Sequence, residues 1–379
     1  MEIFNINHSL KDIPIPSKQD YLEKLINKIE ETIKRIRWKT YFYLNEGNKN
    51  GENTINNFGF KTQKSPPRNK LLDTFEKEFV DIINKIEYRP YIDKFQKEIK
   101  EEVRKISKEK NILVRADKTN NIYKVHPDKY KRLMNDTITK KYRKDKEKIN
   151  EDKINLDGKR ITKQLKISDR VQQIQIKNAY ILLKDHKQDF CINPTTRLIN
   201  PTKTELGKIS KGILERINNE VKLFFSLNLW KNTEEAIHWF KHIDGKNEAS
   251  FIQFDIVDFY PTITEELLDN AIIMARTVTN ITKEEIEIIK HCRKTLLYFN
   301  QEHWNKNVSS DFEISMGSLD SAQISDLIGL FILYNLTNSK NISLENVGLY
   351  RDDGLLIIKK ANPNKIERTK KELIKNSKK

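Results

Sequence analysis

The sequence predicts an α+β fold in which an antiparallel sheet is backed by helices. Two segments, residues 254–261 and 348–358, are rich in apolar and β-favouring residues, and aspartates interrupt both. Residue pairs that resemble helix N-terminal capping boxes precede or follow the first of these segments: Asn232 with Glu235, Thr262 with Glu265, and Thr282 with Glu285. Helices thus alternate with the aspartate-bearing strands, which favours an α+β layer over a doubly wound α/β fold.

The N-terminal third is predicted to be helical and interrupted by a linker. Ser17 and Asp20 mark a helix start, and apolar residues follow at helical spacing as far as Ile36. Glycines, asparagines and a Pro-Pro pair indicate a loop after that helix, and two further apolar stripes indicate two more helices. The predicted segments are a helical extension (1–46), a linker (47–69) and a second helical extension (70–110).

The middle of the chain, residues 111–205, is predicted to mix short strands with a very basic run at 140–148, which is interpreted as a solvated helix or loop. From Leu206, apolar residues recur about every four positions as far as Val221, which predicts a long helix. This helix leads into residues 206–379, the segment that carries both aspartate-bearing strands. No internal repeat is evident.

The aspartates in the two strands predict a shared metal site. A buried strand seldom accepts a carboxylate unless a cation or hydrogen bonds compensate for its desolvation. Asp255, Asp352 and Asp353 would repel one another if clustered, and Mg²⁺ or Mn²⁺ would neutralise them. Hard oxygen ligands of this kind suit phosphoryl transfer assisted by two divalent ions.

Spacing within each strand adds further expectations. Alternation along the first strand puts Asp258 at a frayed end of the strand, which stops at Pro261. Residues 350–354 predict a tight hairpin turn that carries both adjacent aspartates. Gly354 is expected to relieve the backbone of that turn.

The order of these segments resembles the reverse transcriptases of retroelements: a D-x-x-D-F-Y block, then Met316-Gly317-Ser318, then Y-x-D-D. The segments ILVRADKTNNIYKV (112–125), YILLKDHK (180–187) and TRLINP (196–201) are more narrowly similar to blocks of Penelope-like elements. The resemblance covers residues 112–360, approximately.

The resemblance implies a right-hand polymerase fold with fingers at 111–205 and an incomplete palm at 206–379. It implies that Asp255, Asp352 and Asp353 bind two Mg²⁺ ions, or Mn²⁺, and that Arg197 with Lys184 or Lys187 grips the triphosphate. Tyr260 would exclude a 2′-hydroxyl, and Met316 with Gly317 would line the template and nucleotide pocket. The implied nucleotide-binding residues are Lys184, Lys187, Arg197, Ile256, Asp258, Phe259, Tyr260, Met316 and Gly317.

The chain also departs from the family pattern. The segment after Gly317 lacks the usual proline, and Asp320 stands where the family tends to be apolar or neutral. The sequence stops at Lys379, before the strand and lysine that usually follow in the palm, and shows no thumb or endonuclease. The expectation is a truncated copy, a fragment of a longer product, or a polymerase that recruits the missing parts.

Composition predicts a nucleic-acid partner and an intracellular protein of the nucleus or cytoplasm. The formal net charge is +16, which attracts phosphate backbones, but an excess of lysine is also common in chains rich in Lys, Asn and Ile, a bias that can simply reflect nucleotide composition. Cys191 and Cys292 form no zinc pattern or disulfide framework, and neither a membrane-spanning run nor a signal peptide is visible. The expected partners are an RNA template, a DNA primer and dNTPs. The sequence sets no oligomeric state.

Three functions fit the sequence. The first is an RNA-directed DNA polymerase. The second is a non-catalytic nucleic-acid-binding remnant or domesticated protein that keeps a basic cleft without turnover. The third, an RNA polymerase that copies RNA, is disfavoured by Tyr260, because an enzyme that uses ribonucleotides needs space for the 2′-hydroxyl.

Overall fold

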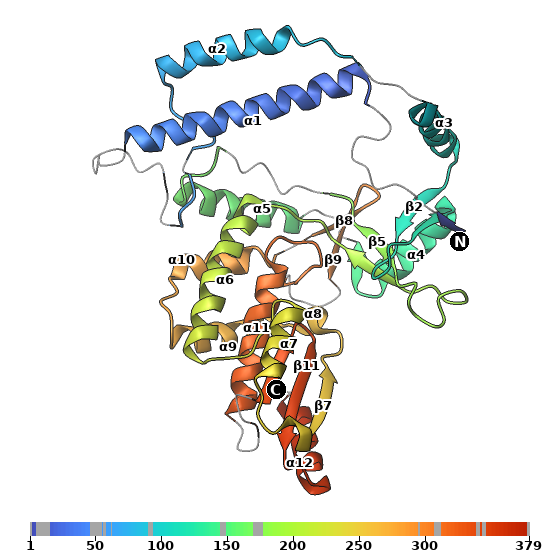
Figure 1. Cartoon of the computed structure of the whole chain (residues 1–379), viewed down its shortest axis with the longest axis vertical. Helices are drawn as coiled ribbons and strands as arrows, with labels where there is room; N and C mark the ends of the chain where they lie inside the picture. Colours follow the sequence, from blue (N-terminus) through green and yellow to red (C-terminus); the bar gives the residue numbers. More distant parts are fainter. Residues whose placement is uncertain are drawn as a thin grey trace. The chain divides into compact units, whose positions relative to one another are not determined.

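The computed structural model describes residues 2–4, 16–45, 55, 58–61, 63–89, 94–144, 149–169, 177–294, 296–306, 312–338, 342 and 346–376. The chain divides into two compact units. The first comprises Met1–Thr137, Leu165–Arg170 and Ile181–Arg197, and the second comprises Ile138–Gln164, Val171–Tyr180 and Leu198–Lys379. Figure 1 shows the elements of both. The segment boundaries predicted from the sequence, at residues 46, 69, 110 and 205, stay predictions.

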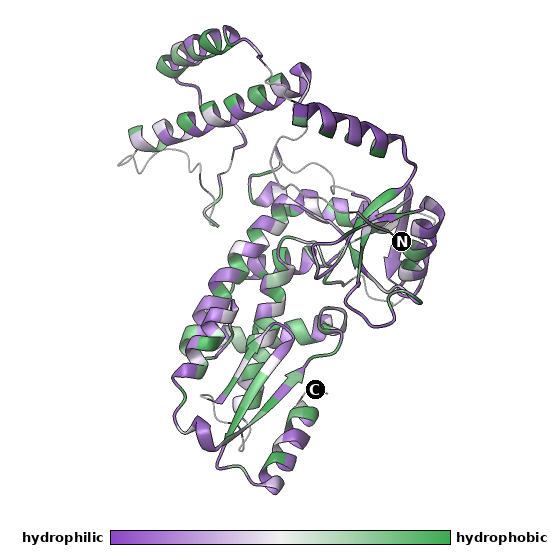
Figure 2. Cartoon of the chain, turned by 45° about the vertical axis from the view of Figure 1, so that its right-hand side comes forward, coloured by the Kyte–Doolittle hydropathy of each residue, from purple (hydrophilic) through white to green (hydrophobic). Residues whose placement is uncertain are grey.

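The first unit combines three helices with a small antiparallel sheet. The helices are α1 (Lys18–Leu44), α2 (Lys70–Asn84) and α3 (Lys94–Lys108), and the sheet has the order β1 (Glu2–Phe4), β3 (Ile122–Val125), β2 (Ile112–Arg115). The side chain of Ser17 caps α1 by accepting from the amide of Asp20, as predicted. Arg37 of α1 binds Asp73 and Glu76 of α2. All three predicted N-terminal helices are confirmed, and α3 is hydrophilic over most of its surface (Figure 2).

The middle of the chain contains α4 (Pro127–Thr139), β4 (Tyr142–Lys144), α5 (Ile149–Gln164), β5 (Tyr180–Leu183) and β6 (Thr196–Ile199), of which β5 and β6 pair. Part of the basic run at 140–148 is thus a strand, where a helix or loop was predicted. β4 pairs with β9 (Glu302–Lys306), which explains this difference, because a partner distant in sequence gives the basic run its extended form. Residues 145–148 of that prediction lie outside the described residues.

The second unit contains the aspartate-bearing strands in one antiparallel sheet, as predicted. Its order is β10 (Val347–Tyr350), β11 (Asp353–Lys359), β7 (Ala249–Asp255). Besides β4, α5 and β9, this unit contains α6 (Glu205–Phe224), α7 (Thr233–Lys241), α8 (Phe259–Thr262), α9 (Glu265–Arg276), α10 (Lys283–His291), β8 (Leu297–Phe299), α11 (Ser321–Thr337) and α12 (Pro363–Asn376). The long helix predicted from Leu206 is α6.

Helix α11 is the centre of the second unit. It packs against α6, α9, α12 and β10. Its buried apolar residues lie around most of its circumference, as expected of a helix enclosed by neighbours: Ile324, Leu327, Ile328, Leu330, Leu333 and Leu336. The helix therefore fixes β10, and with it the hairpin to β11, within a packed core.

Two of the three predicted helix starts are confirmed. Asn232 caps α7 by accepting from the amide of Glu235, and Thr282 with Glu285 forms a complete capping box at α10. The third prediction is wrong: Thr262 ends the short helix α8, and Thr264 caps α9 by accepting from the amide of Leu267. In this segment threonine occurs twice in three residues, and the second, after extended Ile263, has the geometry that a cap requires.

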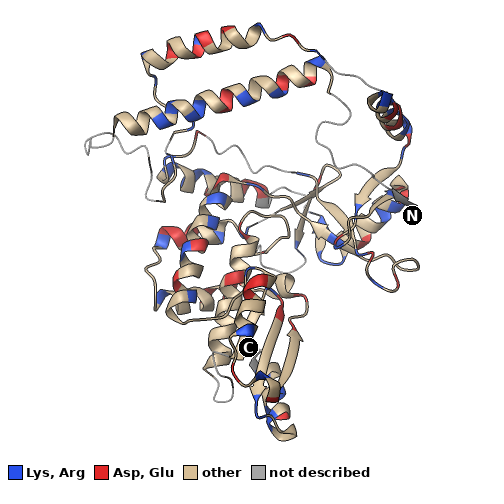
Figure 3. Ribbon diagram, viewed as in Figure 1, with Lys and Arg blue, Asp and Glu red and all other residues tan. Residues whose placement is uncertain are grey.

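Within the described ranges, no helix is both long enough and apolar enough to cross a membrane. Lysine and arginine residues lie on elements of both units (Figure 3).

Candidate carboxylate site

The strand register brings the predicted aspartates together at one end of the sheet. Asp255, the last residue of β7, is directly paired with Asp353, the first residue of β11. The amide of Ile256 donates to the carbonyl oxygen of Asp352 at 2.9 Å. Directly opposed residues have Cβ atoms about 4.5–5.5 Å apart and side chains on the same face. The carboxylates of Asp255 and Asp353 are therefore neighbours.

The face that carries these two carboxylates is open near them. Alternation places Gln253 and Phe251 on the same face as Asp255, and all three are exposed, with Phe251 at 48 %. Tyr350, which pairs with Asp353, shares this face and is also exposed. Farther along, the ring of Phe240 on α7 contacts the Phe251 ring, with centroids 5.8 Å apart. The end of the sheet with the carboxylates thus remains accessible to a ligand.

The hairpin turn differs from the predicted one. Its two loop residues are Arg351 and Asp352, because Tyr350 pairs with Asp353. Arg351, with φ of 58°, takes the left-handed conformation, which is the mark of a loop position that usually selects glycine. Gly354 has no such conformation and lies within β11, so the prediction that it relieves the turn is wrong. Asp353 likewise lies in the strand, whereas Asp352 lies on the turn, as predicted.

Gly354 is explained by an aromatic ring instead. A Cβ atom added at this position would overlap the ring of Phe254, its cross-strand partner on β7. On the opposite face of the hairpin, a Cβ atom at Gly348 would overlap the ring of Trp230. Because each glycine lacks a side chain, an aromatic ring can lie directly against its strand. Both faces of the sheet are thus tightly packed beside the carboxylates.

The chain beyond Asp255 also differs from the prediction. The strand ends at Asp255 rather than at Pro261, and Asp258, at φ 51°, is the N-terminal flanking residue of α8. Aspartate tolerates this left-handed conformation better than most residues, which allows the abrupt change from strand to helix. Phe259 is only 4 % exposed, so its ring belongs to the core. Tyr260 is half-buried beside it.

Gly317 is required by the protein's own backbone. It has φ of 120°, and an added Cβ atom would lie 2.6 Å from the carbonyl oxygen of Asn200. The amide of Asn200 in turn donates to the carbonyl of Met316 at 2.9 Å. Close approach to Asn200, the residue that follows β6, is thus a sufficient reason for this glycine, and the predicted close approach to a ligand stays a prediction.

Asp320, the departure from the family pattern, is a buried structural residue. It forms an ion pair with Arg293, and both side chains are 1 % exposed. The hydroxyl of Ser210 on α6 donates to its other carboxylate oxygen at 2.5 Å. Asp320 thus links α6 and the start of α11 to the segment after α10. Sequence reasoning gave it no partner, because Arg293 carries no pattern that marks it as buried.

The first unit contains the three basic residues of the prediction, Arg197, Lys184 and Lys187. The three aspartates belong to the second unit. The Arg197 Nη1 atom forms an ion pair at 2.9 Å with Oδ1 of Asp117, whose side chain is 3 % exposed. A guanidinium carries five N–H donors, so this ion pair engages only part of it. Asp117 was not predicted as a site residue. It lies in the 112–125 segment that carries the family resemblance, and this was the signal available for it.

The turn after β5 carries both lysines. Lys184 is half-buried and Lys187 is exposed. Between them, Asp185 accepts hydrogen bonds from Thr119 at 2.5 Å, from Asn121 at 2.9 Å and from Tyr123 at 3.0 Å. Burial opposes the charged form of Asp185, but these three donors together hold its pKa below the usual value. The turn is therefore anchored to the β2–β3 hairpin.

The donor chemistry of the carboxylate site fits a divalent cation. Its oxygens are hard ligands of the kind that Mg²⁺ prefers, and Asp255, Asp352 and Asp353 are all exposed at one end of the sheet. Among the described residues, no three histidine, cysteine, aspartate or glutamate side chains are grouped closely enough to hold a metal ion. Carboxylates repel one another unless a cation neutralises them. The fit to a divalent cation therefore rests on the strand register, which brings the three aspartates to one end of the sheet, and not on the positions of their side chains.

No known family model and no curated protein matches the chain. Among solved structures, apo telomerase from Candida tropicalis, truncated from its C-terminal domain, is similar at 11 % identity and a TM-score of 0.48, over 92 % of this chain and 80 % of that one. Telomerase from Candida albicans in complex with a fragment of telomeric RNA is similar at 9 % and 0.46, over 81 % and 52 %. The RNA-dependent RNA polymerase of bacteriophage phi12 is similar at 12 % and 0.33, over 48 % and 30 %. Scores this low do not establish a common fold.

Proposed function

We propose that the chain is an RNA-directed DNA polymerase, the reverse-transcriptase domain of a retroelement. The observation that carries this proposal is the strand register that opposes Asp255 to Asp353, with Asp352 on the adjoining turn. This arrangement gathers hard oxygen donors on an exposed sheet end, which nucleotidyl transfer requires. The Penelope-like resemblance of residues 112–125, 180–187 and 196–201 favours that class of retroelement.

Asp255, Asp352 and Asp353 would hold two Mg²⁺ ions, with Mn²⁺ as an alternative. When bound, these ions would activate the primer 3′-hydroxyl and neutralise the charge of the leaving oxygens. The chain itself contributes positioning, because the two β-strands hold the carboxylates in a fixed register on a packed sheet. Within this proposal the second unit provides most of the palm, and residues 111–205 provide the fingers.

Tyr260 would lie beneath the sugar of the incoming dNTP and exclude a 2′-hydroxyl. Ile256, Asp258 and Phe259 would contribute through the backbone of the turn that follows β7, since the Phe259 ring is buried. Met316 and Gly317 would line the template side of the nucleotide.

From the fingers, Arg197 would bind the triphosphate together with Lys184 or Lys187. Arginine offers a planar fork that suits phosphate oxygens, and lysine offers a mobile point charge. Because Asp117 already binds one side of the guanidinium, it would aim the remaining donors of Arg197.

A second candidate is a nucleic-acid-binding protein without turnover. The net charge of +16 favours this candidate, because electrostatic binding to a phosphate backbone needs positive charge and no catalytic site. The two functions are separated by primer extension on an RNA template with dNTPs and Mg²⁺ or Mn²⁺, for the unaltered chain and for Asp352→Asn. Extension that is lost in Asp352→Asn supports the polymerase. Salt-sensitive binding of the primer–template with no extension by either protein contradicts it and supports the second candidate.

A further inference from the structure

Arg351 occupies an unusual position for a charged residue. It is the second residue of the Y-x-D-D segment and the first of the two loop residues between β10 and β11, with φ of 58°. A side chain other than glycine pays a conformational cost in this region, so such residues persist where other contacts hold them. We therefore expect the contacts of the Arg351 guanidinium to hold the residue in this conformation.

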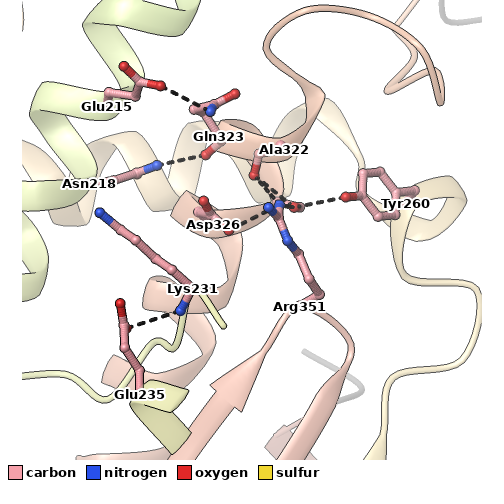
Figure 4. A network of polar contacts seen from close by, with 10 residues as sticks. Glu215, Asn218, Lys231, Glu235, Tyr260, Ala322, Gln323, Asp326 and Arg351 are labelled. Carbon is pink, nitrogen blue, oxygen red and sulfur yellow. Dashed lines mark hydrogen bonds and ion pairs between the residues drawn. The ribbon is translucent and has the colours of Figure 1, made fainter. Parts of the chain in front are cut away.

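In the part of the chain that the structure describes, the polar contacts of the Arg351 guanidinium are made to the first turns of α11. Its Nη1 atom donates to the carbonyl of Ala322 at 2.8 Å and to the hydroxyl of Ser325 at 3.0 Å. The same atom lies 3.2 Å from Oδ1 of Asp326, with which it forms an ion pair. Figure 4 shows the guanidinium reaching from the hairpin to this helix. The turn that carries Asp352 is thus tied to the centre of the second unit.

Ser325 continues the network to Tyr260. The Ser325 hydroxyl is buried and lies 3.3 Å from the Tyr260 hydroxyl oxygen, to which it donates. It also lies 2.9 Å from the Ala322 carbonyl, so Tyr260 and Ala322 are alternative acceptors for its single hydrogen. Arg351 donates to the hydroxyl oxygen of Ser325, so the serine accepts in that bond and its own hydrogen stays available for Tyr260 or Ala322. One serine therefore joins the hairpin turn to the tyrosine.

Asp326 completes the support of the arginine. Burial raises the pKa of Asp326, and the positive charges of Arg351, Lys231 and Lys222 oppose that rise. A partly buried carboxylate and a helix carbonyl hold the arginine in place, because the carboxylate would lose its ion-pair partner if the arginine left.

We infer that Arg351 and Ser325 are positioning residues that fix the Tyr260 hydroxyl relative to the carboxylate hairpin and thereby set the selectivity between deoxyribose and ribose. The inference rests on the proposed polymerase function, in which Tyr260 contacts the sugar. Arg351 and Ser325 act through Tyr260 and the turn, not on the nucleotide. Removal of either should thus change how well the two sugars are distinguished, as well as the stability of the fold.

The test uses Arg351→Ala and Ser325→Ala, with Thr337→Val as the matched control. Thr337 also donates its hydroxyl to the carbonyl three residues earlier in α11, at 3.0 Å, but lies at the far end of the helix. The measured quantity is the ratio of kcat/KM for a dNTP to that for the matching rNTP in primer extension. We expect the ratio to fall about fivefold in each variant, which corresponds to one hydrogen bond, and to stay unchanged in the control.

Tyr260→Phe decides whether Ser325 acts through the tyrosine hydroxyl. In that background Ser325→Ala should have no further effect on the ratio, because the bond is already lost. Equal effects of Ser325→Ala in both backgrounds overturn the inference. An unchanged ratio in Arg351→Ala and Ser325→Ala, with an active wild type, overturns it while the proposed function stands.

A second measurement needs no turnover. Hydrogen–deuterium exchange should be faster in Arg351→Ala than in the unaltered chain at the amide of Ile256, which binds the Asp352 carbonyl, and in residues 257–262. The same exchange as in the unaltered chain contradicts the positioning role. A wild type that extends primers with neither sugar contradicts the proposed function and the selectivity role together, and exchange then decides the positioning role by itself.

Discussion

Asp255 and Asp353 are directly opposed across β7 and β11, and their side chains share one exposed face of the sheet. Like charges at this distance repel, so the pair is unfavourable for the isolated fold. The packed hairpin keeps them opposed: Phe254 covers Gly354 on one face and Trp230 covers Gly348 on the other. Rigid packing of the strands is thus what holds a repulsive pair in place.

Gly354→Ala tests this packing. The added methyl overlaps the Phe254 ring, and overpacking of this kind destabilises a core by about 1 to 3 kcal/mol. Urea unfolding should show a loss of this size. The loss should be smaller when Phe254→Leu is present as well, because leucine can yield to the methyl. Equal losses in both backgrounds would show that the ring is not the obstacle.

The buried ion pair of Arg293 and Asp320 gives a prediction about stability. Asp320→Asn leaves the Arg293 charge buried without its partner, and breaking such a pair costs about 3 to 5 kcal/mol. Arg293→Met together with Asp320→Leu removes both charges and should cost less than Asp320→Asn. Denaturant unfolding of the two variants measures both losses, and a double variant less stable than the single one contradicts the interpretation.

His291 gives a prediction about pH. Burial, followed by the charge of Lys294, lowers the pKa of His291 from 6.5 to about 4. Since the unfolded chain binds this proton more readily, stability is full above about pH 6.5 and is lost as the pH falls toward 4, by at most about 1.4 kcal/mol per unit. His291→Gln should flatten this slope in unfolding experiments. The exposed substitution His186→Gln is the control, and an unchanged slope in His291→Gln would refute the prediction.

Tyr260→Ala tests the role of the tyrosine in sugar selection. If its ring excludes the 2′-hydroxyl, the kcat/KM for an rNTP should rise relative to that for the dNTP by about tenfold or more. Tyr298→Ala, at a half-buried tyrosine on β8, is the control and should leave the ratio unchanged. Unchanged dNTP preference in Tyr260→Ala would remove Tyr260 from the sugar contact.

The sequence predicted those features that depend on local pattern. The apolar spacing from Leu206 and the cap at Ser17 predicted α6 and α1, and the alternating segments around Asp255 and Asp353 predicted an antiparallel sheet. Each of these follows from neighbouring residues and their periodicity.

Features that depend on partners distant in sequence were predicted wrongly or missed. Gly354 was assigned to the turn, but the Phe254 ring explains it, and the contact of Gly317 with Asn200 was missed. The role of Asp117 was missed because its partner, Arg197, comes from another strand. No local pattern specifies which side chain will cover a glycine or pair with a buried carboxylate.

The most direct test of the central claim is the rate of Mg²⁺-dependent primer extension on an RNA template by Asp255→Asn and Asp353→Asn. Asp244→Asn, the same change at an exposed residue of the second unit, is the matched control. If the opposed carboxylates hold the catalytic ions, both site variants should lose at least about 100-fold in rate while Asp244→Asn stays active. Extension by Asp255→Asn and Asp353→Asn at the rate of the unaltered chain would contradict the account.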